Sequence, residues 1–146
     1  MKGELKVTII ENGTVIDHLP AGSALRVVNL LDLSTKLPVI IAMNVDSPRH
    51  RKKDMVKIED KFLSKQETDK LSLIAPNATI NIIKKKKVSD KRKVTPPDEV
   101  KGLLDCPNKR CITNFEDCGT RFLKNGSNYK CYFCESQFTI DDFNLY

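Results

Sequence analysis

The chain has 146 residues, of which 40% are hydrophobic and 30% are charged, and its formal net charge is +6. This length suits one ordinary domain or two small ones, and no apolar run approaches the ~20 residues that a membrane-spanning helix needs. The N-terminus has no basic segment followed by an apolar one, as a secretory signal would, so we expect a cytoplasmic protein without membrane contact.

The first part of the chain predicts one strand and one helix. Residues 5–18 are rich in β-branched and apolar side chains, with a turn or bulge expected at Gly13. A break that contains proline and glycine follows, and residues 24–33 then repeat apolar side chains at the spacing of a helix. The apolar face that we predict for this helix consists of Leu25, Val28 and Leu31.

Two further strands and a second helix are predicted next. The strands are expected at residues 37–45 and 54–59, joined by a polar loop that contains proline. Ser64 and Glu67 have the spacing of a capping box, in which each side chain accepts a hydrogen bond from the backbone of the other residue. This pattern predicts the start of a helix that runs to Ile74.

A last strand is expected at residues 78–88, and it completes the order βαββαβ. That order is typical of a ferredoxin-like fold of the α+β class, an antiparallel sheet with its helices on one face. The end of the strand is strongly basic, because residues 84–87 and 91–93 place seven positive charges within ten positions. Such a block is either a solvated surface or a binding surface for nucleic acid or a phosphorylated small molecule.

A boundary between two domains is predicted at Pro96 and Pro97, since two prolines do not fit inside a sheet and stiffen a connection. None of the five cysteines precedes Cys106. The chain therefore divides into a cysteine-free part, residues 1–97, and a cysteine-rich part, residues 98–146. A domain as small as the second part usually needs a metal or another cross-link to be stable.

The cysteine spacing predicts a structural metal site. The pattern is C-x4-C, a gap of 19 residues and C-x2-C, and the predicted ligands are Cys106, Cys111, Cys131 and Cys134. Zn²⁺ binds four thiolates in a tetrahedron, which leaves no open position for a catalytic water. Between the two pairs, a hairpin tip at residues 125–127 and a returning strand at residues 129–139 predict a zinc-ribbon-like fold.

Disulfides and an iron–sulfur cluster are the alternatives to zinc. The expected reducing compartment disfavours disulfides, and iron–sulfur clusters more often have other cysteine spacings. Cys118 is the one cysteine outside the pattern, and we expect it to be buried or half-buried.

One run is more specific than any periodicity, namely residues 13–22 with the sequence GTVIDHLPAG. It resembles the regulatory chain of aspartate carbamoyltransferase. Further segments are similar to the same family in collinear order over almost the whole chain; they are residues 53–54, 57–59, 75–81, 106–108, 111–112 and 131–135.

The resemblance implies a non-catalytic regulatory subunit with an allosteric domain, residues 1–97, and a zinc domain, residues 98–146, that contacts the catalytic chain. It also implies one structural zinc per chain, nucleoside triphosphate effectors of the CTP and ATP type, and control of pyrimidine biosynthesis. Regulatory homodimers would link catalytic trimers into a dodecamer of six catalytic and six regulatory chains. The nucleotide site that the resemblance implies consists of Val7, Val15, Asp17, His18, Lys57, Asn81, Ile83, Val88 and Lys91.

Two positions differ from the family pattern. Thr8 stands where an acidic residue can occur, and Lys86 stands where an aromatic residue can line the ribose or base. A lysine does not stack on a base as an aromatic ring does, although its charge favours phosphate. The preference among bases is therefore not predicted.

Two other classes of function compete with this interpretation. A zinc-ribbon nucleic-acid-binding module would need exposed aromatic rings on its strands, and the predicted strands of residues 5–88 contain no Phe, Tyr or Trp. A metalloenzyme would need an open metal site, but His18 and His50 are the available histidines and neither has a metal-ligand spacing with a carboxylate. We therefore expect neither nucleic-acid binding nor catalytic residues.

Overall fold

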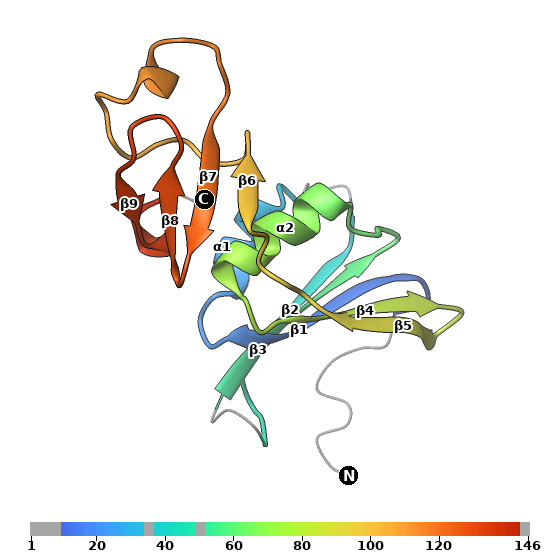
Figure 1. The fold of residues 1–146 in the computed structure, drawn as a ribbon. Helices are drawn as coiled ribbons and strands as arrows, with labels where there is room; N and C mark the ends of the chain where they lie inside the picture. Colours follow the sequence, from blue (N-terminus) through green and yellow to red (C-terminus); the bar gives the residue numbers. More distant parts are fainter. Residues whose placement is uncertain (1–9, 34–36, 49–51, 144–146) are drawn as a thin grey trace. The chain divides into compact units, whose positions relative to one another are not determined.

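The structure is a computed structural model that describes residues 10–33, 37–48 and 52–143. It divides into two compact units, Met1–Thr95 and Pro96–Tyr146, each with its own sheet (Figure 1). Nucleotide binding by residues 1–97 and contact with a catalytic chain by residues 98–146 stay predictions. Among the described residues, no helix has the length and apolar character that crossing a membrane requires.

The N-terminal unit is an antiparallel sheet with two helices on one face (Figure 1). Its strands are β1 (Gly13–Pro20), β2 (Val39–Asp46), β3 (Lys52–Glu59), β4 (Thr79–Lys84) and β5 (Lys87–Lys93). They pair in the order β2-β3-β1-β4-β5, and the helices are α1 (Ala24–Leu30) and α2 (Lys65–Ile74). Because β3 lies between β1 and β2, the first four strands have the ferredoxin-like order, which confirms the predicted α+β fold class.

The predicted strand at residues 78–88 is wrong in its extent, since a turn at Lys85 and Lys86 divides it into β4 and β5. Both lysines have positive φ angles, 53° and 67°, in a tight turn that usually favours Asn and Gly. The Lys85 amide donates to Asn12 Oδ1 (3.1 Å) and the Lys86 amide donates to the Glu11 carbonyl (2.8 Å). The sequence did not predict this turn, because lysine rarely occupies turn positions with positive φ angles.

Helix α1 is shorter than predicted and buries a different face. Leu25 is 56% exposed and Val28 is only partly buried against the core. The buried apolar residues of this segment are Ala24, Val27 and Leu31, so Leu31 is the one member of the predicted face that is buried. The buried carboxylate of Asp54 accepts a hydrogen bond from the Ala24 amide (2.9 Å), which fastens the first turn of the helix to β3.

Helix α2 begins as predicted. Ser64 Oγ accepts a hydrogen bond from the Glu67 amide (3.1 Å), and Glu67 Oε1 accepts one from the Ser64 amide (3.0 Å), so the predicted capping box is confirmed. The helix ends at Ile74, just before Pro76.

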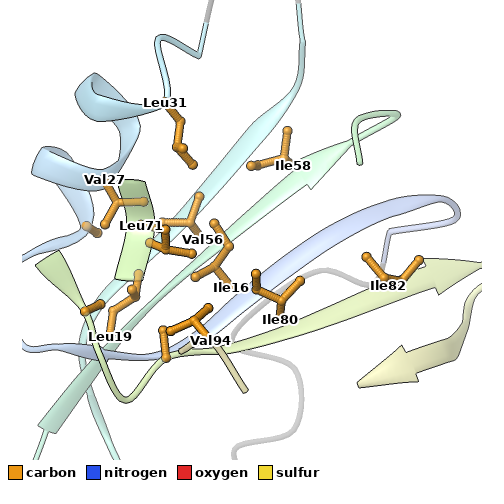
Figure 2. Packing of buried hydrophobic residues seen from close by; sticks show 13 residues of the cluster. Ile16, Leu19, Val27, Leu31, Val56, Ile58, Leu71, Ile80, Ile82 and Val94 are labelled. Atoms are coloured by element: carbon orange, nitrogen blue, oxygen red, sulfur yellow. The ribbon is translucent and has the colours of Figure 1, made fainter. Parts of the chain in front are cut away.

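The core of this unit lies between the sheet and its helices (Figure 2). The labelled side chains that meet there are Ile16, Leu19, Val27, Leu31, Val56, Ile58, Leu71, Ile80, Ile82 and Val94. The described part of the predicted first strand begins its pairing at Gly13, and residues 5–9 lie outside the described residues. A Cβ on Gly13 would lie 2.1 Å from the Ile58 carbonyl oxygen, so only glycine allows this approach of β1 to β3.

The C-terminal unit is a small antiparallel sheet in the order β6-β7-β8-β9. Its strands are β6 (Glu99–Lys101), β7 (Arg121–Asn125), β8 (Asn128–Cys131) and β9 (Gln137–Phe138). The predicted hairpin tip at residues 125–127 is confirmed, with Gly126 at a φ of 64°. The predicted strand at residues 129–139 is interrupted after Cys131, because the second cysteine pair lies on a turn. Phe122 and Phe143 pack edge to face in the core, with ring centroids 5.0 Å apart.

Candidate functional site

The four predicted ligand cysteines converge on one point in the C-terminal unit. Cys106 Sγ lies 3.8 Å from Cys134 Sγ, and Cys111 Sγ lies 3.7 Å from Cys131 Sγ. All four sulfur atoms lie within 4.8 Å of one another. A tetrahedron with metal–sulfur bonds of ~2.3 Å has edges of about 3.8 Å, so the sulfur atoms are spaced to hold a single metal ion.

The five cysteines are free in the structure. The separations of 3.7 and 3.8 Å are far longer than the ~2.05 Å of a disulfide bond, so the cluster is not a pair of disulfides. Cys118 lies outside the cluster, but the prediction that it is buried or half-buried is wrong. It is exposed because it lies in an irregular loop before β7, where residues 114–119 are all exposed.

Hydrogen bonds from nearby side chains hold one cysteine loop in place and affect the pKa of a cysteine thiol. Asn114 Nδ2 donates to the carbonyl oxygens of Cys106 (3.1 Å) and Asn108 (2.8 Å), which fixes the first cysteine loop. Burial raises the pKa of the Cys106 thiol. Burial also opposes ionisation of Cys134, but hydrogen bonds from Asn108 and Ser136 outweigh it and lower its pKa to about 6. A lowered pKa favours the thiolate form, which is the form that binds a metal.

The predicted nucleotide residues form a second group, on the face of the N-terminal sheet opposite the helices. Lys57 on β3 pairs with Val15 on β1, Val15 pairs with Asn81 on β4, and Asn81 pairs with Lys91 on β5. Cross-strand partners project to the same side of a sheet, so these four residues form one row. Ile83 extends the group on the same side.

A β-bulge in β1 contains two more predicted residues, Asp17 and His18, which lie beside this row. The pairing of β1 with β3 shifts between Ile16 and Leu19, and His18 within the bulge has a φ of 59°. His18 Nδ1 lies 3.0 Å from Thr79 Oγ1. The Asp17 carboxylate accepts a hydrogen bond from the His18 amide (2.6 Å).

Two lysine side chains interact with Asp17. Lys53 Nζ lies 2.9 Å from Asp17 Oδ1, and both side chains are largely shielded from water. Burial lowers the pKa of Lys57, and the negative charge of Asp17 partly opposes this effect. Sequence reasoning did not select Lys53, although its place four residues before Lys57 on the same strand puts the two side chains on one face.

The remaining predicted residues differ in their surroundings. Val15 and Ile83 pack with Ile10 into a small apolar cluster, whereas Val88 is 59% exposed at the sheet edge. Val7 lies outside the described residues. A hollow of ≈ 260 Å³ adjoins His18, but none of the other predicted nucleotide residues that the structure describes lines it.

Each of the two units of the chain matches a known protein domain. Residues 5–95 match the aspartate carbamoyltransferase regulatory chain, allosteric domain, and residues 98–144 match the metal binding domain of the same regulatory chain. The chain belongs to this family. The aspartate carbamoyltransferase regulatory chain of Methanococcus aeolicus is 51% identical over 138 residues, covering 92% of this chain and 89% of the relative.

A second relative gives the same result. The regulatory chain of Pyrococcus horikoshii is 49% identical over 139 residues, covering 90% of this chain and 91% of the relative. The resemblance drawn from residues 13–22 is therefore confirmed. The chain is a regulatory, non-catalytic one, with an allosteric domain followed by a metal-binding domain.

Proposed function

We propose that the chain binds nucleoside triphosphates of the CTP and ATP type and transmits their effect to the catalytic chains of aspartate carbamoyltransferase. It would thereby control pyrimidine biosynthesis in the cytoplasm. The observation that carries the proposal is the row Lys57, Val15, Asn81 and Lys91, which lies on the helix-free face of an allosteric domain.

Each residue of the row has chemistry that suits part of a nucleotide. The ammonium groups of Lys57 and Lys91 lie on different strands and supply the positive charge that a triphosphate needs. Asn81 offers both a donor and an acceptor for a base edge, and Asp17 with His18 adds further polar groups at the bulge. The apolar walls would come from Val7, Val15, Ile83 and Val88.

We propose zinc as the metal, one ion per chain, in a structural role. Two of the sulfur–sulfur separations, 3.7 and 3.8 Å, match the edge of a tetrahedral Zn²⁺ site, and all four sulfur atoms lie within 4.8 Å of one another. Four protein ligands leave no open position for chemistry. When bound, the ion would hold together a small domain whose own core is limited.

The C-terminal unit offers a surface for the catalytic chain. Ile112 follows Cys111 directly, and Tyr132 and Phe133 lie between Cys131 and Cys134. These three side chains, here called the knuckle surface, are 52%, 52% and 41% exposed. Exposed apolar side chains gathered on two metal-binding turns are typical of a protein interface.

The N-terminal sheet offers an edge for a second regulatory chain. The edge strand β2 exposes Ile41 (37%) and Met43 (38%), and no strand of the described residues pairs with its outer side. The other edge, β5, carries mainly lysine and arginine, which would repel a second copy. We therefore propose a homodimer through β2, as part of an assembly of six regulatory and six catalytic chains.

Calorimetry tests the nucleotide site. Lys57→Ala should weaken triphosphate binding by about 1.5–3 kcal/mol, since it removes a charge-assisted contact. Lys65→Ala is the matched control, because Lys65 lies on α2, on the opposite face, with its side chain 87% exposed. Equal affinities in the two variants would remove Lys57 from the site.

Size analysis with a catalytic trimer tests the partner. The full chain should form a complex larger than the trimer, and the activity of that complex in carbamoyl transfer should respond to nucleotides. A trimer that stays unchanged in size when the metal-loaded chain is added would contradict the proposed docking.

A further inference from the structure

A charged side-chain pair fastens β6, the strand that follows the domain boundary, to β7. Arg121 Nε donates a hydrogen bond to Glu99 Oε2, and 39% and 31% of the two side chains are exposed. In the β6–β7 pairing, Glu99 lies opposite Leu123 and Lys101 lies opposite Arg121, so the Arg121–Glu99 pair is diagonal. Lys101 Nζ lies 3.9 Å from the other Glu99 oxygen.

The same guanidinium lies over an aromatic ring of the knuckle surface. Arg121 Cζ is 4.4 Å from the centroid of the Tyr132 ring, and the Arg121 carbonyl oxygen accepts a hydrogen bond from the Tyr132 amide (2.8 Å). Tyr132 in turn meets Phe133 edge to face, with centroids 5.3 Å apart. A planar guanidinium can bind a carboxylate at its edge and a ring on its face at once, which a lysine ammonium cannot.

The chain between the two units is short and stiff. Val94 is buried in the N-terminal core, and the Asp98 carbonyl oxygen accepts a hydrogen bond from the Lys124 amide (2.8 Å) in the C-terminal sheet. Residues 95–97 alone separate these anchors, and two of them are proline. Few residues are therefore available to absorb a displacement of the end of β5, and such a displacement would be passed on to β6 and Glu99.

We propose that Arg121 is a positioning residue that ties the knuckle surface to β6, so that movement at the linker alters how Tyr132 and Phe133 meet the catalytic chain. This inference rests on the proposed function, since it takes the knuckle surface as the docking site. Arg121 acts through the two aromatic rings, and Glu99 makes their placement sensitive to the linker.

The test uses the full-length chain loaded with metal and mixed with a catalytic trimer. The variants are Glu99→Gln, Arg121→Gln and the double variant, and Lys124→Gln is the control, because it removes one positive charge from an exposed position of the same strand. Three quantities are measured for each: metal per chain, the dissociation constant for the trimer, and the ratio of carbamoyl-transfer rates with and without nucleotide.

Glu99→Gln should keep its metal and assemble within about threefold of the parent, as expected for a partly exposed ion pair, yet lose most of the nucleotide response. Arg121→Gln should keep its metal, weaken assembly by about tenfold and also lose the response. The double variant should match Arg121→Gln, because the two residues act through one contact. Lys124→Gln should behave like the parent.

Unchanged assembly and an unchanged response in Arg121→Gln would overturn the proposal. If Arg121→Gln loses its metal, Glu99→Gln decides, and an unchanged response in that variant overturns the proposal as well. Failure of the parent chain to assemble would contradict the proposed function and the positioning role with it. A parent that assembles and responds, beside variants that do the same, contradicts the positioning role alone.

Discussion

Replacing one cage cysteine should unfold the C-terminal unit and leave the N-terminal unit folded. The variant is Cys111→Ser, because Cys111 is 2% exposed and its sulfur lies 3.7 Å from Cys131 Sγ inside the cluster. The matched control is Cys118→Ser, which makes the same chemical change at an exposed cysteine outside the cluster.

The expected magnitude follows from what else holds this unit together. Its buried apolar residues outside the cage are few, namely Val100, Leu104, Phe122, Tyr129 and Phe143 among those described. Binding of structural zinc contributes about 10–16 kcal/mol near neutral pH, which is similar in size to the ~5–15 kcal/mol stability of a typical domain. Losing a ligand removes a large share of that contribution, so the metal-free unit should not remain folded.

Elemental analysis and limited proteolysis measure the outcome. The parent and Cys118→Ser should hold one zinc per chain and resist cleavage throughout, while Cys111→Ser should lose the metal and be cut between about residue 96 and the C-terminus. Calorimetry should still find nucleotide binding in the variant, because the row on the N-terminal sheet is intact. A Cys111→Ser chain that keeps one zinc and a protease-resistant C-terminal unit would refute the reasoning.

Two further predictions concern the N-terminal unit. Ile41→Lys places a charge on the exposed edge strand and should weaken the homodimer by at least about tenfold in sedimentation, whereas Leu25→Lys on α1, also exposed, should not. Burial opposes ionisation of Glu67, but the Ser64 amide and the Lys61 ammonium outweigh it and lower its pKa. The resulting stabilisation is present above the ordinary glutamate pKa and is lost as the pH falls through the lowered folded pKa. Glu67→Gln should therefore cost about 0.5–1 kcal/mol at neutral pH and less in acid, as chemical denaturation at several pH values would measure; an equal loss at all pH values would contradict this origin.

Features that depend on neighbours in the sequence were predictable. The capping box of α2 needs only Ser64 and Glu67 three residues apart, and the hairpin tip needs only a turn sequence around Gly126. The convergence of the cysteines followed from paired spacing. The turn at Lys85 and Lys86 was missed because its geometry is held by bonds to residues 11–12, far away in the sequence.

Features that depend on strand register were not predictable from one sequence. The row that joins Lys57 to Lys91 exists because β3, β1, β4 and β5 pair in one register, and a shift of one residue would turn its members to the helix side. The buried face of α1 was predicted wrongly for a related reason. Its apolar residues can form two alternative faces, and the hydrogen bond from the Ala24 amide to the buried Asp54 carboxylate holds Ala24 toward the core. The resemblance to a family supplied the predicted nucleotide residues where local patterns could not. It did not place Lys53 among them, although residues 53–54 match the family.

The lysine-rich strand β5 limits how far the N-terminal sheet can grow. Two chains joined through β2 would form a continuous sheet with a copy of β5 at each end, and every residue of β5 is exposed. Joining two such dimers through their β5 edges would bring rows of ammonium groups against each other, which opposes the open-ended stacking that leads to fibres. The charge on this strand would thus close the assembly at two chains and keep a concentrated regulatory protein from aggregating through its free edges.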